Sequence, residues 1–182
     1  YSTDNDDVLC QELTINKGKY IFGFLGSISK YKGIDLLVDT IIEYKTNLID
    51  INVEIIIAGL GYLPRIEELQ KTSNVTIINR HLSDHEISFL YRKCDCIVLP
   101  YTRISQSGVL FTAIAMNTPV IVTNCGGLTE PFDHGNIGQI LSEQTIEELY
   151  QKIVLVVESL REGGFLNHEF QKVKAIYSWG KI

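Results

Sequence analysis

The sequence has no long apolar run and no excess of positive charge, and these two absences exclude several classes of protein. No apolar run reaches the roughly 20 residues that a helix needs to cross a bilayer. The formal net charge of -6 argues against a dedicated nucleic-acid binder, which normally carries a basic face. The 182 residues suffice for one domain with a substantial core, and a hydrophobic content of 45% is typical of a globular chain.

The chain also lacks a recognisable cysteine motif. The four cysteines are Cys10, Cys94, Cys96 and Cys125. Their spacing fits neither a zinc site nor a redox pair with two intervening residues. Cys94 and Cys96 lie in an expected strand and share one face of it, unless one of them sits at the strand entrance. We interpret the cysteines as reduced, buried thiols, which predicts a cytoplasmic protein.

Short apolar runs alternate with amphipathic stretches from Tyr20 onward. The runs are nearly continuously apolar and are bounded by Gly, Pro or Asn, as expected of parallel strands buried on both faces. They cover Tyr20–Leu25, Val53–Ala58, Val75–Ile78, Cys96–Leu99, Val120–Thr123 and Gly138–Leu141. The stretches between them carry helical stripes, of which the first is Ile34, Leu37, Val38, Ile41 and Ile42. This alternation predicts an α/β fold with a doubly wound parallel six-stranded sheet and helices on both faces.

Local signals set the expected boundaries of helices and of the domain. Ser83 with Glu86, and Thr145 with Glu148, have the spacing of capping boxes that open two helices. The first residues, by contrast, are polar and acidic and lack a strong period. We therefore expect residues 1–19 to be a linker or arm from a missing N-terminal domain, and residues 20–182 to form one domain.

The loops after the strands are the expected places for chemistry, because ligands of such sheets bind outside the carboxyl ends of the strands. After the first strand, Gly26 permits a sharp turn and Lys32 stands just before a helix start, where it could contact phosphate. The glycine patterns of dinucleotide-binding and P-loop proteins are both absent. The alternative interpretation of Lys32 is an ordinary solvent-exposed lysine in a turn.

Two further loops carry weaker signals. After the fourth strand, Ser105 or Ser107 could cap a helix whose first amides Gly108 leaves open to an anion. A plain serine-capped helix without a ligand is the alternative there. After the third strand, Arg80 or Leu82 could pack on a nucleotide base, although polar residues after a strand are routine.

No metal site is expected. Asp4-Asn5-Asp6 has the form of a DxD metal motif, but it lies in the polar opening segment, where a solvated tail is favoured. The histidines are His81, His85, His134 and His168. No pair of them has metal-ligand spacing on one helix. For Glu130 we favour a structural role over contact with a ligand.

Five patterns in chain order resemble the retaining GT-B glycosyltransferases of group 1, also called family 4. They are Gly26-x5-Lys32-Gly33-Ile34, Ala58-Gly59-Leu60-Gly61, Ser83 through Pro100 with Asp95 in place of the family aspartate, Asn117-Thr118-Pro119-Val120-Ile121 followed by Gly126-Gly127-Leu128-Thr129-Glu130, and Ser178-Trp179. Each pattern is weak alone, but their order is specific. The resemblance implies the C-terminal, donor-binding domain of such an enzyme, which binds a UDP- or GDP-type sugar as substrate and needs no cofactor and no metal.

The same resemblance implies a set of donor-binding residues. They are Gly26, Ser27, Lys32, Arg80, Leu82, Ser107, Gly108, Val109 and Thr112. Lys32 would contact the diphosphate, the loop around Arg80 would hold the base, and the amides near Gly108 would bind the distal phosphate.

The sequence departs from the family where two glutamates, seven residues apart, are expected. Ile104 and Thr112 stand at these positions, and Thr112 could make only a weaker hydroxyl contact with the ribose. Gln106 and Ser107 are the candidates to replace the missing glutamates, and Lys30 is near enough to replace a basic residue expected after Gly26. The catalytic residues therefore stay unassigned.

The predicted function is transfer of a sugar from a nucleoside-diphosphate sugar to a glycan or lipid-linked acceptor, in polysaccharide biosynthesis. Because the acceptor-binding domain is missing, we expect this fragment alone to be inactive, and we expect any peripheral membrane contact to run through the missing half. One alternative is a degenerate GT-B half that serves as a non-catalytic interaction module. Another is a Rossmann-type enzyme that uses NAD or a methyl donor, which the absent glycine pattern disfavours.

Overall fold

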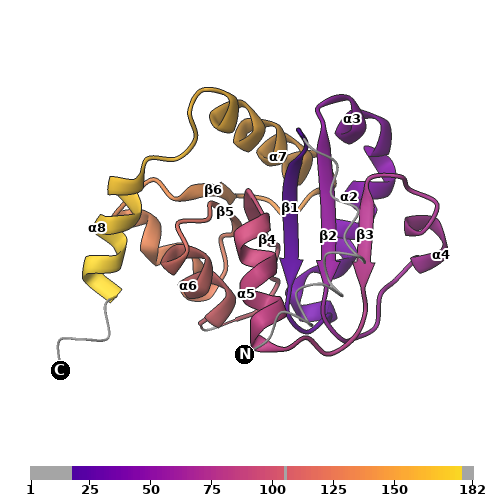
Figure 1. The fold of residues 1–182 in the computed structure, drawn as a ribbon, viewed down its shortest axis with the longest axis horizontal. Coiled ribbons are helices and arrows are strands. Elements are labelled where there is room, and N and C mark those ends of the chain that lie inside the picture. The colour runs from indigo at the N-terminus through magenta and orange to yellow at the C-terminus, as the bar shows by residue number, and fades with distance from the viewer. Residues whose placement is uncertain (1–17, 105, 178–182) are drawn as a thin grey trace.

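A computed structural model describes residues 18–104 and 106–177, and Figure 1 shows its six-stranded sheet. The strands are β1 (Tyr20–Leu25), β2 (Val53–Ala58), β3 (Val75–Ile78), β4 (Cys96–Leu99), β5 (Val120–Thr123) and β6 (Gly138–Leu141). They lie in the order β3-β2-β1-β4-β5-β6, and every neighbouring pair is parallel. The predicted fold class and strand positions are confirmed. Asp4–Asp6, Cys10, Ser105 and Ser178–Trp179 lie outside the described residues.

Helices and short 3-10 turns connect the strands. They are η1 (Lys30–Lys32), α2 (Ile34–Glu43), α3 (Lys45–Asp50), α4 (Ile66–Leu69), α5 (Asp84–Lys93), α6 (Gly108–Ala115), η2 (Gly126–Leu128), η3 (Glu130–Asp133), α7 (Ile146–Arg161) and α8 (Asn167–Tyr177). Within the described part of the chain, no helix is both long and apolar enough to cross a bilayer.

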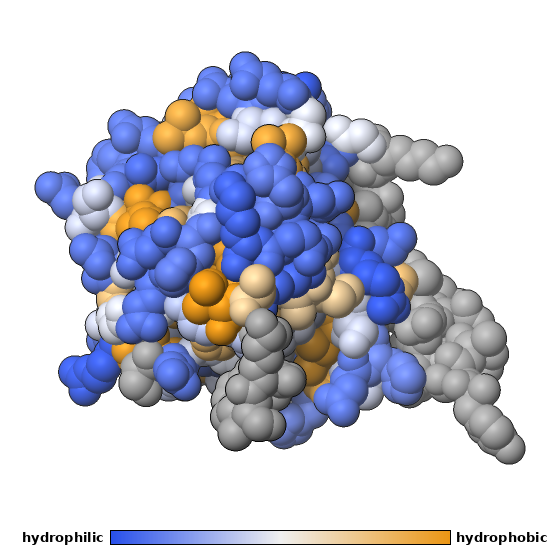
Figure 2. Space-filling view, turned by 90° about the vertical axis from the view of Figure 1, so that its left-hand side faces the viewer, coloured by the Kyte–Doolittle hydropathy of each residue, from blue (hydrophilic) through white to orange (hydrophobic). Residues whose placement is uncertain are grey.

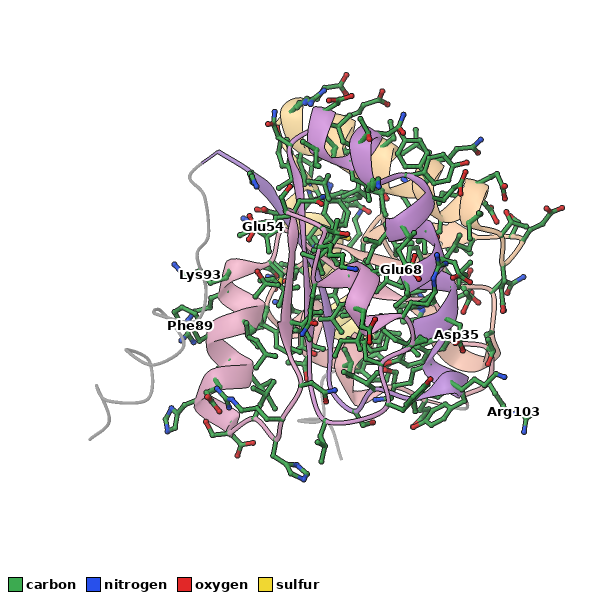
Figure 3. The ribbon with its side chains drawn as sticks, turned by 90° about the vertical axis from the view of Figure 1, so that its right-hand side faces the viewer. Asp35, Glu54, Glu68, Phe89, Lys93 and Arg103 are labelled. Carbon is green, nitrogen blue, oxygen red and sulfur yellow. The ribbon has the colours of Figure 1, made fainter. Side chains whose placement is uncertain are left out.

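The helices cover both faces of the sheet and form two hydrophobic cores. Side chains of α2, α3, α4 and α7 share one core with the β1 side chains Phe22 and Phe24. Side chains of α5, α6 and α8 share the other core with Ile21 and Leu25 of the same strand. This alternation along β1 is the period-two pattern of a strand buried on both faces. Figure 3 shows the two layers, with α5 on one side of the sheet and α2 and α4 on the other.

The cysteine expectation is corrected in one respect. Cys94 ends α5 and Cys96 begins β4, and the two thiols belong to the cores on opposite faces of the sheet. The prediction of one shared face was therefore wrong, and the alternative of one cysteine at the strand entrance is confirmed. Burial raises the pKa of both thiols, which keeps them protonated and unreactive.

The two predicted capping boxes have different outcomes. Ser83 and Glu86 form a complete box at the start of α5. At α7, Thr145 accepts a hydrogen bond from the Glu148 N–H, but the Glu148 carboxylate instead accepts from the N–H groups of Ser142 and Glu143. Thr145 therefore caps α7, but Glu148 does not accept a hydrogen bond from the Thr145 N–H as a capping box requires. The glutamate orders the loop after β6 instead.

The strand order creates a switch point between β1 and β4. The chain builds β1, β2 and β3 in one direction and then continues with β4 on the other side of β1. In Figure 1 the arrowheads of β1, β2 and β3 point downward, so the loops that follow them gather at the lower rim. This rim is where parallel sheets of this order bind ligands. The face viewed from the α8 side is mainly hydrophilic, with apolar side chains only in small separate groups (Figure 2).

Candidate functional site

The loops after β1 and β2 approach each other closely at the lower rim. The Gly26 N–H donates to the Ala58 carbonyl at 2.9 Å, and the Ile28 N–H donates to the Leu60 carbonyl at 2.9 Å. A Cβ atom on Gly59, whose φ is +146°, would lie 1.9 Å from the Gly26 carbonyl oxygen. Only glycine fits this contact, so the glycine pattern after β2 serves backbone packing.

Lys32 is buried at this rim, only 9% exposed. It ends the 3-10 turn η1, and Gly33 follows in the left-handed conformation before α2 begins. Among the described residues no acidic side chain forms an ion pair with it. The alternative of an ordinary solvent-exposed lysine is therefore wrong.

The electrostatics of Lys32 favour an anionic ligand. Burial lowers the pKa of its ammonium, and the nearby Tyr31 partly opposes this shift. Its Nζ lies over the ring of Tyr101, 5.8 Å from the ring centroid. The Lys32 side chain is mostly removed from water. A positive charge held in such surroundings is costly without a negative partner. A bound phosphate would supply that partner.

Lys32 and the start of α6 meet at Gly26. A Cβ built on Gly26 would lie 3.5 Å from Lys32 Nζ and 3.7 Å from Val109 Cγ2. The loop after β4 is also tied to η1, because the N–H and Oγ1 of Thr102 both donate to the Tyr31 carbonyl, at 2.9 and 3.2 Å. The two predicted anion-binding helix starts thus lie side by side at one rim.

The start of α6 is capped by Ser107, and the space beside Gly108 is empty. Ser107 is buried, and its Oγ accepts a hydrogen bond from the Leu110 N–H at 3.3 Å. A Cβ on Gly108 would meet no atom within 4 Å, so the first turn of the helix faces free space. Gln106 is exposed just before this cap. Arg103, on the same loop, extends outward at the lower rim in Figure 3.

A cavity of about 330 Å³ lies beside Gly26, at the ends of β1, β2 and β3. Its lining is formed by Gly26, Ser27, Gly59, Leu60, Arg80, His81, Leu82 and Ile87. The predicted residues of the first and third loops are therefore brought together. Leu60 and Ile87 were not among the predicted site residues, and their apolar side chains also line the cavity.

Arg80 stabilises the third loop through its own contacts. Its Nη2 donates to Glu86 Oε1 at 2.8 Å, and its Nη1 donates to the His81 carbonyl at 3.1 Å. The Arg80 guanidinium, with the Ser83 bonds of the capping box, holds the pKa of Glu86 at about 2 despite its burial. The guanidinium therefore fixes the loop against α5 while it lines the cavity.

Other predicted residues lie elsewhere. Thr112 donates from Oγ1 to the Gly108 carbonyl at 2.8 Å and lines a different hollow, between α6 and α8. Ile104 packs against the core on the α6 face. His134 contacts the Tyr177 ring edge-on. In the described part of the chain no three His, Cys, Asp or Glu side chains gather where they could hold a metal ion.

The family model for glycosyl transferases group 1 matches residues 19–159, a range that includes all six strands and the rim described above. Among curated relatives, an uncharacterised glycosyltransferase of Methanocaldococcus jannaschii is 32% identical over 178 residues, which cover 94% of this chain and 48% of that protein. A capsular polysaccharide biosynthesis glycosyltransferase of Staphylococcus aureus is 30% identical over 172 residues, or 89% of this chain and 43% of that protein. The chain thus spans about half the length of these relatives.

One of the solved structures with the same fold is that of a single domain solved by itself. The C-terminal domain of a group 1 glycosyl transferase family protein from Francisella tularensis matches with a TM-score of 0.73 at 19% identity, over 98% of this chain and 95% of that domain. Anabaena HepE in complex with UDP and glucose matches with a TM-score of 0.70 at 19% identity, over 98% of this chain and 48% of that one. At this identity the likeness concerns the fold alone.

Proposed function

Because the chain belongs to the glycosyl transferases of group 1, we propose that it is the donor-binding domain of a retaining enzyme of polysaccharide biosynthesis. The enzyme moves a sugar from a nucleoside-diphosphate sugar onto a glycan or a lipid-linked acceptor. The observation that carries the proposal is the buried Lys32 side chain, whose ammonium has no acidic partner in the described chain and lies near the start of α6.

Each part of the rim has a role in donor binding. The diphosphate lies against Lys32 and Gly26 and accepts hydrogen bonds from the first amides of α6, at Gly108 and Val109, where the helix dipole adds positive potential. The base enters the cavity of about 330 Å³ and packs on Leu82. The Anabaena relative of the same fold binds UDP, so UDP is the first donor class to test and GDP the second.

Transfer requires a second domain. The relatives are about twice as long as this chain, which supports an acceptor-binding domain joined through residues 1–19 to the domain of residues 20–182. Catalysis needs donor and acceptor oriented together. The present chain should therefore bind the donor and transfer no sugar by itself.

A non-catalytic interaction module is the second candidate. The observation that favours it is the absence of an acidic side chain at Ile104 and Thr112, the positions where the resembling family carries glutamates. Such a module would keep the fold and lose the affinity for nucleotides. Ligand binding separates the two candidates directly.

The test is calorimetric titration of the chain with UDP, GDP, ADP and NAD. We expect micromolar to millimolar binding of UDP or GDP, and Lys32→Met should weaken it by about 10- to 150-fold, or about 1.5–3 kcal/mol for one charged hydrogen bond. Lys45→Met removes an exposed ammonium at the start of α3 and should change nothing. If the folded chain binds no nucleoside diphosphate at millimolar concentration, the interaction module is the better description.

A further inference from the structure

Tyr101 lies at the centre of the rim. It lies two residues after the end of β4 and is 1% exposed, and the Lys32 Nζ lies over its ring at 5.8 Å from the ring centroid. A cation within about 6 Å of a ring centroid is attracted by the electron-rich face of the ring. The geometry is therefore that of a cation–π contact between two buried side chains.

Lys32 has few other groups that stabilise its charge. The titratable groups that face it are Tyr31, on its own 3-10 turn, and Tyr101. Gly26 and Val109 approach from the β1 loop and from α6, and neither carries a charge. Since no acidic side chain of residues 18–104 and 106–177 pairs with Lys32, the Tyr101 ring is the electron-rich group that the structure offers it.

Tyr101 is also joined to both anion-binding loops. Its carbonyl accepts a hydrogen bond from Thr123 Oγ1 at 2.5 Å, and the next residue, Thr102, binds the Tyr31 carbonyl through two donors. Its buried hydroxyl faces Ser107, the cap of α6, but no described residue forms a hydrogen bond of ordinary geometry with it. Burial raises the pKa of Tyr101 to about 12, so the ring is a neutral phenol. The Tyr101 ring thus contacts Lys32 on one side, and its hydroxyl lies near the cap of α6 on the other.

We propose that Tyr101 is a positioning residue of the donor site, whose ring holds the Lys32 ammonium in front of the first turn of α6. This inference rests on the proposed function for its ligand, but its geometry concerns the free protein. The ring fixes where the positive charge sits before the diphosphate arrives. Its electron density also offsets part of the cost of burying the ammonium.

The test lowers the electron density of the ring at position 101 while keeping the shape of the side chain. Tyr101→Phe removes only the hydroxyl, and incorporation of difluoro- and trifluoro-phenylalanine at position 101 then lowers the electron density of the ring step by step. The Lys32 pKa is followed by NMR with isotope-labelled lysine, and UDP and GDP affinities are measured on the same samples. We expect the Lys32 pKa to fall with each step and the diphosphate affinity to fall by about two- to fivefold along the series.

A matched control exists on α5, where Lys93 lies over the Phe89 ring at 5.3 Å from the ring centroid, on the opposite side of the sheet from Asp35 of α2 (Figure 3). The same fluorinated residues at position 89 should leave Lys32 and nucleotide binding unchanged. If the Lys32 pKa and the affinity are flat along the series at position 101 while the wild type binds nucleotide, the positioning role is overturned and the proposed function stands. If no variant binds nucleotide but the Lys32 pKa still falls along the series, the proposed function fails and the positioning of Lys32 by Tyr101 stands.

Discussion

The two ends of the sheet differ in how they hold buried charge. At the amino end, Glu54 is 3% exposed and meets Lys19 Nζ at 3.4 Å, and Asp95 accepts a hydrogen bond from the Ile21 N–H at 2.8 Å. At the carboxyl end, Lys32 is nearly as buried, and no acidic side chain of the described residues pairs with it. At the amino end the structure thus places a cation beside Glu54, whose buried Oε2 accepts no hydrogen bond, whereas at the carboxyl end it places no anionic side chain of the described residues beside Lys32.

The difference is not one of cavity size. Hollows of about 550 and 500 Å³ lie at the amino end, where the helices lead into β4, β5 and β6. The cavity at the carboxyl end measures about 330 Å³. In the larger hollows Glu169 pairs with Lys172, while Arg92 and Glu162 are exposed to water. The smaller cavity lies beside the buried Lys32 side chain, with which no acidic side chain of the described residues pairs. A buried charge without a counter-charge therefore locates the site better than cavity volume does.

The largest effect is expected from glycine substitutions that compare the two ends. Gly59→Ala places a methyl group 1.9 Å from the Gly26 carbonyl oxygen, so we expect a loss of about 3 kcal/mol or more in the free energy of unfolding. Gly163→Ala, in the loop between α7 and α8, has a similar positive φ but meets no atom within 4 Å, so it should cost only about 1–2 kcal/mol. Urea denaturation measures both. Equal losses would show that the close approach of the β1 and β2 loops does not matter.

The next largest effect is expected from replacing the two lysines at the opposite ends of the sheet, one of which supports stability and the other binding. Lys19→Met leaves the buried Glu54 without its ion-pair partner and should lower the free energy of unfolding by about 1–3 kcal/mol, with nucleotide binding unchanged. Lys32→Met removes a buried charge that has no acidic partner in the described chain, so its stability should equal or exceed that of the wild type. Thermal unfolding without ligand tests both variants. A Lys32→Met variant less stable than Lys19→Met would reverse the contrast between the two ends.

The fold was predictable from the sequence, and the reason is physical. A strand such as Cys96–Leu99 is continuously apolar because both of its faces are buried, and the stripe along Ile34–Glu43 has a helical period because one face packs on the sheet. These patterns are local, and their periods are those of the strand and of the helix. The error over Cys94 arose where only two residues separate the end of a helix from the start of a strand, a boundary that no periodic pattern marks.

The site was predictable only in part. Gly26 and Lys32 were named from loop positions and Val109 from the family resemblance, and the structure brings them together because their loops follow neighbouring strands. The burial of Lys32 could not be predicted, because Lys32 lies in a polar, glycine-containing loop of the sequence. Its burial depends on Tyr101, which comes from a distant segment of the chain. For the same reason no sequence pattern showed that Thr112 would line another hollow, one turn along α6.

A smaller effect is expected from acid titration of the third loop. The folded-state pKa of Glu86 is about 2 against an ordinary value of 4.5, so its contribution to stability is complete above pH 4.5 and is lost as the pH falls toward 2. Glu86→Gln removes this contribution and should flatten the stability profile over that window. Denaturant midpoints of both proteins, measured at about six pH values between 6 and 2, would show this flattening. Parallel profiles for the two proteins would mean that the Arg80–Glu86 pair does not fix the loop.

The smallest effect concerns the open start of α6, where a methyl group can be added without disturbing the fold. Gly108→Ala meets no atom within 4 Å and replaces glycine at the first helical position, so stability should stay equal or rise by up to about 1 kcal/mol. The added Cβ stands in the space through which a phosphate would approach the first amides, so UDP or GDP affinity should fall by about fivefold. Calorimetry on this variant therefore asks whether the helix start takes part in binding at all. Unchanged affinity would leave Lys32 as the anion contact without the α6 amides, and the contrast between the two ends would then rest on one ammonium group alone.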